Sequence, residues 1–381
     1  MLFRRPKIKD SFSVLINKAG DISVGKRAGA SFVVCNPPLW VSDCLALLNG
    51  IHEVGQIYEL LNNKYPTLDK KKVDKLLTSL TSISAIEDQA YVSEYLNDTE
   101  LDLYSRQMQG FSLIEKHGRN AIYYQEILKK QNVLVFGAGG WGSWLTMNLA
   151  LSGFGNITLV DGDNVELSNL NRQILYTHED IGKLKVLAAK ENLNNINPHI
   201  CVQSVPKYLL SEALDLLNLL IRGKTLIFLA WTNLAYYIDS VATESIHRVA
   251  HEMNIPVFEI GANPFEVSVG PIFANDRKSP CFQCVKSEIK DSFFSKDEKI
   301  RSFQKLHLEK MQHNQNQPPS AQNATSLSIM GGIAVDQAIK FVTNMDRTVT
   351  YSTKFQMFLN DLSIKNTTYN KKHNCICSNK I

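Results

Sequence analysis

The feature of the sequence that most constrains the fold is a cluster of glycines, Gly137-Ala138-Gly139-Gly140-Trp141-Gly142, here called the glycine loop. It follows Asn132–Phe136, a short apolar run typical of a buried strand, and precedes a helical pattern over Trp144–Ser152. A second apolar run, Asn156–Val160, ends at Asp161. A strand, a glycine-rich turn, a helix and a strand that ends at an acidic residue together predict a nucleotide site at the edge of a parallel sheet.

The four glycines of the loop are candidate nucleotide-binding residues, and their positions have physical reasons. Gly137 permits the tight turn, Gly139 lets the backbone approach a phosphate, and Gly142 lets the helix pack closely on the strand, while Gly140 lies between them. The helix that follows offers N–H donors and the positive end of its dipole to a phosphate, and Asp161 is placed to accept from ribose hydroxyls. On its own this fingerprint indicates a dinucleotide, so an NAD-dependent oxidoreductase is the first hypothesis.

The rest of the second half continues the alternation of strands and helices. The sequence predicts helices over 183–195 and 239–254 and strands over 224–230 and 256–260. Strands and helices in turn predict an α/β fold with a Rossmann-like, mostly parallel sheet and right-handed crossovers.

Cationic residues near the glycine loop favour a triphosphate over NAD. Arg172 and Lys185 are placed to clamp β- and γ-phosphates, and Asn169 could donate to a phosphate oxygen. A hydride transferase has no need for such cationic density there. The alternative is that these charges belong to a solvated surface.

The region from Tyr104 to Pro198 resembles the ThiF/MoeB/HesA branch of the ubiquitin-activating-enzyme superfamily. The motifs that carry the resemblance are Ser105-Arg106-Gln107, the glycine loop, Val160–Asp163, Ser168–Gln173, Gly182–Lys185 and Asn194–Pro198. The resemblance implies that the chain binds ATP and Mg²⁺. It also implies that a carboxylate of a peptide or protein attacks the α-phosphate, which gives an acyl-adenylate and pyrophosphate.

The resemblance also assigns roles to single residues. Asp161 would hold the ribose; the phosphates would be held by Asn169, Arg172, Gln173 and Lys185. Arg106 would reach the ATP of the other protomer, since the family is homodimeric; it joins Arg172 and Lys185 as the implied catalytic residues. After the strand that ends at Ala230 the family usually has an acidic residue that serves Mg²⁺, but this chain has Thr232. Metal coordination would then fall to Asp163, ATP oxygens and water.

Seven cysteines, an odd number in a chain without a secretory signal, argue against a disulfide framework. Two short pairs, Cys281/Cys284 and Cys375/Cys377, supply four thiolates that suit one structural zinc ion, as in this superfamily branch. The alternative is two unrelated buried pairs. No cysteine lies between Cys284 and Cys375, so no carrier-protein thioester is expected. His247 and His251 show no metal or triad spacing and are expected to be core or surface residues.

The N-terminal part has a different pattern. Short strand-like runs over 12–16 and 31–35, separated by glycines, are followed by three short helical stripes before residue 95. Residues 1–95 therefore predict a winged-helix-like α+β domain. It resembles the PqqD-type domains that capture the leader of a ribosomally made precursor peptide as an added strand, here beside 31–35 and facing Val73, Leu76 and Leu77. DNA binding through the lysines at 70–72 is the less favoured alternative, because base-reading Arg or Asn side chains are missing.

A leader-binding domain followed by an adenylating domain over 96–381 resembles enzymes that modify precursor peptides in antibiotic biosynthesis. The resemblance implies ATP-driven activation of a glutamate side chain for intramolecular closure with loss of water. Adenylation of the peptide's C-terminal residue is the runner-up, and a pure binding module is an alternative of another class. Within the second domain, the change of composition over 286–325 predicts a mobile crossover insertion.

Composition limits the other partners. The chain has 41 Lys and Arg against 37 Asp and Glu, so its net charge of +4 gives no reason to expect nucleic acid. It has no apolar run of about 18 residues and no signal peptide, so neither a membrane partner nor secretion is expected and the predicted compartment is the cytoplasm.

Overall fold

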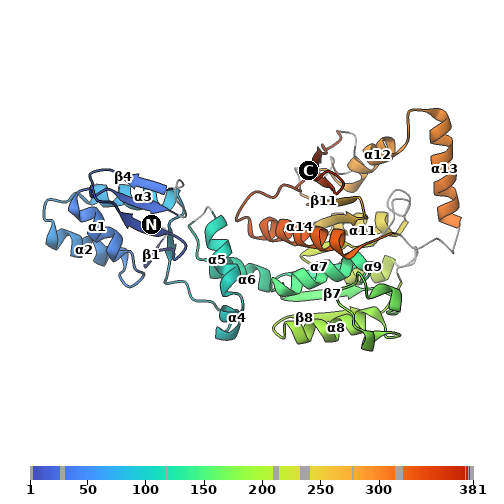
Figure 1. Cartoon of the computed structure of the whole chain (residues 1–381), viewed down its shortest axis with the longest axis horizontal. Helices are drawn as coiled ribbons and strands as arrows, with labels where there is room; N and C mark the ends of the chain where they lie inside the picture. Colours follow the sequence, from blue (N-terminus) through green and yellow to red (C-terminus); the bar gives the residue numbers. More distant parts are fainter. Residues whose placement is uncertain are drawn as a thin grey trace. The chain divides into compact units, whose positions relative to one another are not determined.

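The structure is a computed structural model in which residues 3–25, 31–115, 118–208, 214–231, 241–276, 279–313, 321–373, 375 and 377 are described. The chain divides into two compact units (Figure 1). The first comprises residues 1–129 with 342–347, and the second comprises 130–341 with 348–381. Among the described residues, no helix combines the length and the apolar character needed to cross a bilayer.

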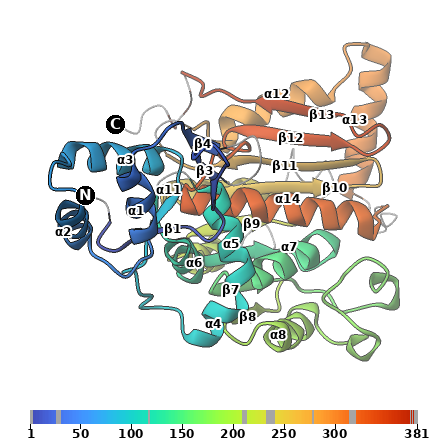
Figure 2. The same cartoon turned by 60° about the vertical axis from the view of Figure 1, so that its left-hand side comes forward.

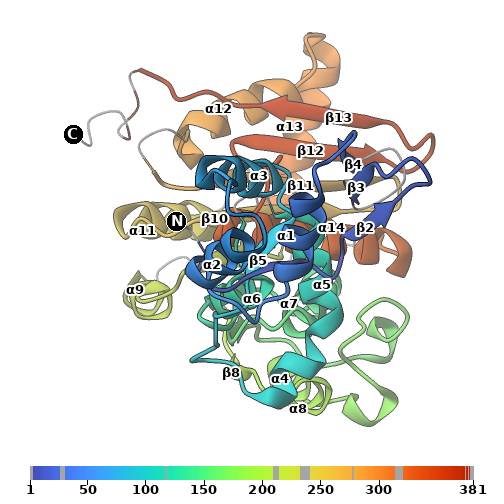
Figure 3. The ribbon, with the colours of Figure 1, turned by 90° about the vertical axis from the view of Figure 1, so that its left-hand side faces the viewer.

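The first unit combines short strands with six helices in its described residues (Figure 3). In chain order these are β1 (Pro6–Ile8), β2 (Ser13–Ile16), β3 (Ile22–Gly25), β4 (Ser31–Val34), α1 (Leu39–Leu47), α2 (Val54–Lys64), α3 (Lys70–Ser82), β5 (Ile86–Asp88), α4 (Asp98–Leu103), α5 (Ser105–Ile114) and α6 (Ala121–Lys129). Polar side chains start some of these helices: Asp69 accepts from the backbone N–H of Lys71 at 2.9 Å, at the beginning of α3.

The predicted antiparallel meander is present, with the order β2-β3-β4. Its central strand β3 was not predicted, because Gly25 was interpreted as a turn residue. Ile22 and Val24 of β3 are buried in a core shared with α1, α2 and α3. Val73 and Leu76 of α3 belong to the same core, so they do not offer the surface for a leader that the sequence predicted.

The second unit contains an eight-stranded sheet. Its elements are β6 (Asn132–Phe136), α7 (Gly140–Leu151), β7 (Asn156–Val160), α8 (Lys185–Ile196), β8 (Cys201–Val205), α9 (Leu214–Ile221), β9 (Leu226–Leu229), α11 (Val241–Glu252), β10 (Val257–Ala262), β11 (Glu266–Phe273), α12 (Phe282–Phe293), α13 (Glu298–His313), α14 (Ala324–Thr343), β12 (Thr353–Phe358) and β13 (Ile364–Thr368). Two single 3₁₀ turns, η1 (Leu167–Asn169) and η2 (His178–Asp180), follow β7.

The strand order is β13-β12-β11-β10-β9-β6-β7-β8. The five strands from β10 to β8 are parallel, and β11, β12 and β13 join antiparallel. The predicted α/β class with a mostly parallel sheet is therefore confirmed. The carboxyl ends of β6, β7 and β9 meet at one edge, which is where ligands bind in open α/β sheets.

Helices cover both faces of this sheet (Figure 2). Alternate residues such as Leu134 and Phe136 of β6 pack in one core cluster with α9, α11 and α12. On the other face, Phe258 of β10 contacts Phe341 of α14, with ring centroids 5.5 Å apart. The segment over 286–325 that was predicted as a mobile insertion contains the end of α12, all of α13 and the first residues of α14.

Candidate functional site

The glycine loop connects β6 to α7, as the sequence predicts. Gly137 has φ of +98°, a conformation that favours glycine, and a Cβ there would lie 2.6 Å from the carbonyl oxygen of Ala230. A Cβ at Gly142 would collide with the carbonyl oxygen of Gly137, so only glycine lets α7 begin this close to the turn. Gly139 faces more open space: its nearest neighbour there is the amide nitrogen of Gln173, at 3.9 Å.

Asp161 is fastened to this loop directly after β7. Its carboxylate accepts from the backbone N–H of Ala138 at 2.7 Å and from that of Asp163 at 2.8 Å. Burial raises the pKa of Asp161, and the two backbone hydrogen bonds only partly oppose that effect. The structure thus holds the predicted ribose ligand at the carboxyl edge of the sheet.

Asp163 and Lys185 form an ion pair, with Nζ 2.8 Å from Oδ2. The hydroxyl of Tyr208 donates to the other carboxylate oxygen at 2.7 Å. Burial works to raise the pKa of Asp163, but the hydrogen bonds from Lys185 and Tyr208 outweigh it and lower that pKa below its usual value. No sequence motif pointed to Tyr208, whose ring lies over Gly162, where a Cβ would be 2.6 Å from the ring.

Asn169, Arg172 and Gln173 follow in and after η1. Asn169 is buried and its side-chain oxygen accepts from the N–H of Glu166 at 3.1 Å. Arg172 is half-buried, and its guanidinium donates to the carbonyl of Ser168 and, at 3.2 Å, to the side chain of Asn171.

Gln173 is 3% exposed, and its buried Oε1 has no hydrogen-bond partner in the described part of the chain. An orphaned acceptor beside the glycine loop fits a site that is completed by a ligand or its water.

Two tryptophans of α7 also shape this site without having been predicted. The indole N–H of Trp144 donates to the carbonyl of Arg172 at 2.9 Å, which fixes the segment that carries the predicted phosphate ligands. The indole of Trp141 donates to the carbonyl of Ala262 at 2.9 Å. The structure therefore brings the glycine loop, Asp161, Asp163, Lys185 and the residues at 169–173 together in the second unit.

Two further residues of the sequence analysis lie outside the described part of the second unit. Arg106 belongs to α5 in the first unit, where it is exposed and donates to the side chain of Gln109 at 3.3 Å. Thr232 lies outside the described residues, so its role as a substitute for the usual acid stays a prediction.

The four predicted zinc ligands come together. Their sulfur atoms all lie within 4.8 Å of one another; Cys281 and Cys375 are 3.4 Å apart, and Cys284 and Cys377 are 3.5 Å apart. A tetrahedral zinc with Zn–S bonds of about 2.3 Å has sulfur–sulfur edges of roughly 3.8 Å, so this cluster fits the ion. Such a closed site would tie the beginning of α12 to the C-terminal segment.

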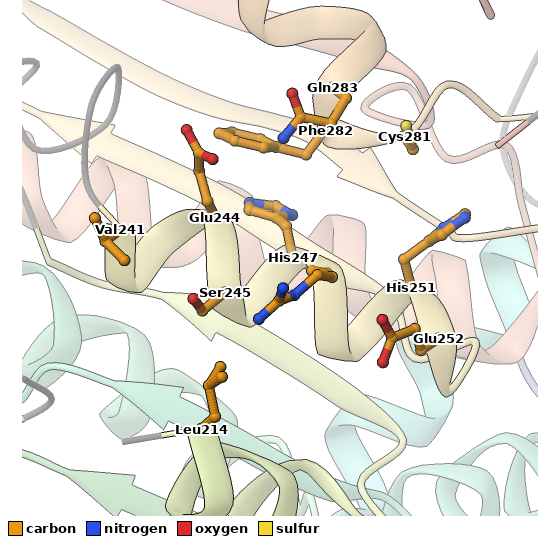
Figure 4. Close-up of a pocket in the computed structure, with 11 residues that line it drawn as sticks. Leu214, Val241, Glu244, Ser245, His247, His251, Glu252, Cys281, Phe282 and Gln283 are labelled. Atoms are coloured by element: carbon orange, nitrogen blue, oxygen red, sulfur yellow. The ribbon is translucent and has the colours of Figure 1, made fainter. Parts of the chain in front are cut away.

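A separate pocket of about 570 Å³ lies between α11 and the first residues of α9 and α12 (Figure 4). His247, on its wall, has Nε2 2.7 Å from a carboxylate oxygen of Glu259 and stacks on Phe282 with ring centroids 4.1 Å apart. His247 is buried, so it has the core role that was expected, with a carboxylate partner on β10 that its spacing did not reveal.

Comparisons with known proteins agree with this geometry. Residues 104–379 match the ThiF family, and residues 11–67 match the PaaA-like N-terminal domain. The molybdopterin-synthase adenylyltransferase of Salmonella typhimurium is 32% identical over 192 residues, which cover 50% of this chain and 70% of that protein. The chain spans only 30% to 42% of the length of the first curated relatives that it matches.

Two solved structures resemble the whole chain. A crystal structure of PaaA is 32% identical, has a TM-score of 0.71, and is matched over 96% of this chain and 100% of its own. A crystal structure of Escherichia coli MccB with ATP is 20% identical, with a TM-score of 0.70 over 98% of this chain and 99% of its own. At that identity the second likeness concerns the fold alone. The expected resemblance, to the ThiF/MoeB/HesA branch with an additional N-terminal domain, is confirmed.

Proposed function

The chain belongs to the ThiF family, and we propose that it is an ATP-dependent adenylating enzyme that activates a carboxylate of a precursor peptide. The observation that carries the proposal is the cluster in the second unit: the glycine loop, Asp161, the Asp163–Lys185 pair and Arg172 lie at the carboxyl edge of β6 and β7. Membership of the family also removes the support for an NAD-dependent oxidoreductase.

The proposed reaction is an in-line transfer of the adenylyl group. A carboxylate oxygen of the peptide forms a bond to the α-phosphorus of ATP, and the bond from that phosphorus to the bridging oxygen breaks. The electron pair leaves with pyrophosphate. The cations of Arg172 and Lys185 stabilise the charge that develops on the leaving group, and Asp161 holds the ribose.

The Asp163–Lys185 pair suggests how the site changes when substrate arrives. Asp163 is a single carboxylate with a lowered pKa, so it is ionised at neutral pH and can serve Mg²⁺ together with ATP oxygens and water. A divalent cation at Asp163 would weaken the pull on the ammonium of Lys185. Lys185 would then be released toward the phosphates.

Peptide recognition is assigned to residues 1–95. The PaaA-like match over 11–67 supports this. A solved structure of MccB in complex with N-formylated MccA has the same fold as the present chain. The strand β4 is an edge of the meander, and its open side can pair with a leader in extended conformation. With Val73 and Leu76 buried, Leu77 is the member of the predicted α3 set that is left partly accessible.

We infer that a glutamate side chain of the peptide is the group activated, for a cross-link that forms within the peptide with loss of water. The likeness to PaaA over the whole chain supports this choice. Activation of the peptide's C-terminal residue is the second candidate. It is supported by the fold shared with MccB.

The test measures pyrophosphate release by the full chain with ATP and the precursor peptide. Wild-type protein is expected to release pyrophosphate, whereas Arg172→Ala loses ATP turnover and still binds the peptide. Arg222→Ala, which removes an exposed arginine at the end of α9, is the matched control and keeps full activity. If Arg172→Ala changed nothing, the chain would be a binding module.

The peptide itself separates the two candidate carboxylates. Replacing the core glutamates by glutamine is expected to abolish pyrophosphate release, and amidating the C-terminus is expected to leave it intact. The reverse result would establish the second candidate.

A further inference from the structure

The helix α14 runs beside α7, and both helices begin at the same edge of the sheet (Figures 1 and 2). A Cβ at Gly140 would lie 2.9 Å from a methyl carbon of Leu327, and a Cβ at Gly331 would lie 3.0 Å from the carbonyl of Trp144. Gly140 is close to Leu327, and Trp144, four residues later in α7, is close to Gly331, four residues later in α14. The two helices are therefore parallel. The positive ends of both helix dipoles are thus directed to the glycine loop.

Gln322, two positions before the start of α14, reaches that loop. A Cβ at Gly140 would collide with the side-chain oxygen of Gln322, so the amide of Gln322 lies against the first residue of α7. The backbone here is held by Asn323, whose side-chain oxygen accepts from the N–H of Ser326 at 3.0 Å. Gln322 is therefore placed by an ordered helix start, far along the chain from all the motifs that predicted the site.

A second amide approaches the loop at the neighbouring residue. Gln173 lies 3.9 Å from the Cβ position of Gly139, and its buried Oε1 has no hydrogen-bond partner among the described residues. The amide nitrogen of Gln173 is the atom near Gly139, and the orphaned oxygen of the same side chain points to a ligand group or water that donates to it. Gln322 lies against the next residue of the loop, Gly140.

We propose that Gln322 donates a hydrogen bond to the α-phosphate of the bound nucleotide, an inference that rests on the proposed function. The amide carries two N–H donors, and its terminal torsion has a broad profile, so it can present them to a phosphate at the start of α7. A neutral amide stabilises the negative charge on the α-phosphate oxygens without forming an ion pair with the incoming carboxylate. This distinguishes its role from those of Arg172 and Lys185.

The first experiment measures binding of adenosine, AMP and a non-hydrolysable ATP analogue by calorimetry. Gln322→Ala is expected to weaken AMP and the ATP analogue by the same factor, about tenfold, as for loss of a hydrogen bond to a charged group. Adenosine binding and the melting temperature are expected to stay unchanged. Gln322→Glu is expected to weaken both nucleotides further, because a carboxylate repels the phosphate.

Gly332→Ala, an exposed change further along α14 where a Cβ would meet nothing within 4 Å, is the control and should bind all three ligands like the wild type. The inference is overturned if Gln322→Ala binds AMP normally, if the loss is confined to the ATP analogue, or if adenosine is lost to the same degree. Should wild-type protein bind no nucleotide, the proposed function itself fails; should Arg172→Ala impair turnover while Gln322→Ala is silent, only this inference fails.

Discussion

Lys9 and Glu115 form an ion pair inside the first unit, with side chains 1% and 0% exposed. The ammonium of Lys9 also donates to the carbonyl of Ser112 at 3.3 Å, and Glu115 accepts from the hydroxyl of Tyr124 at 3.1 Å. These contacts join the turn after β1 to the end of α5 and to α6. A buried charge is tolerated only while its partner stays in place.

Lys9→Met is expected to destabilise the protein by about 3–5 kcal/mol, because it leaves the Glu115 carboxylate buried without its cation. Urea unfolding of the first unit, followed by far-ultraviolet circular dichroism, measures the change. Lys7→Met is the control. It removes the ion pair with the exposed Asp10 and should alter the free energy of unfolding by less than about 1 kcal/mol. Equal effects of the two variants would contradict the importance of burial here.

At the scale of elements, the start of α7 depends on the absence of a side chain. Gly142→Ala puts a methyl group against the carbonyl of Gly137 in the turn, and neither backbone segment can move without opening the loop. We expect this variant to lose nucleotide binding and to unfold at a lower temperature, as calorimetry and thermal melts will show.

Gly55, in the second position of α2, provides the opposite case. A Cβ there would meet nothing within 4 Å, so Gly55→Ala is expected to stabilise the protein by about 0.5–1 kcal/mol. A gain of stability at Gly142 would show that helix propensity rather than close packing governs that site, and a loss at Gly55 would show that its surroundings are not open.

The cysteine cluster gives a prediction for α12 and the C-terminal segment. We expect about one zinc ion per chain by elemental analysis, since the four sulfur atoms match a closed tetrahedral site. Cys284→Ser should lower the zinc content and the melting temperature together. Cys44→Ser, at a buried cysteine of the first unit, should leave the zinc content unchanged. Full zinc occupancy in Cys284→Ser would refute the assignment.

At the scale of the whole molecule, the family resemblance implies that two copies share each site. Arg106→Ala and Arg172→Ala are each expected to be inactive. When the two variants are mixed and allowed to exchange subunits, the hybrid dimers contain one intact site, and activity should return to about a quarter of the wild-type level. If Arg106 served the site of its own chain, mixing would restore nothing, and pyrophosphate assays distinguish the two cases.

The sequence predicted the parallel part of the sheet well, because β6, β7, β9 and β10 are continuous apolar runs buried on both faces. It missed β8 at one end of the parallel part, and the antiparallel strands β11, β12 and β13. The exposed strand β13, with the sequence IKNTT, has no apolar alternation, and only pairing with β12 defines it.

The candidate site, like the sheet, could be predicted from the sequence only in part. Its motifs could be read along the chain, since Asp161, Arg172 and Lys185 lie near the glycine loop in sequence. Tyr208 and Gln322 could not be found in this way, because their positions depend on contacts with Asp163 and Gly140 that only the folded chain creates.

In the described part of the chain, the outer strands β2 and β4 of the meander each have one unpaired edge. The exposed side chains of Leu15 and Ile16 lie on β2. Neither outer strand contains a proline or a charged residue that would discourage other chains from attaching. In concentrated solution, this domain without a bound peptide is therefore prone to self-association through these edges. Producing it together with its natural peptide should yield cleaner preparations than producing it alone.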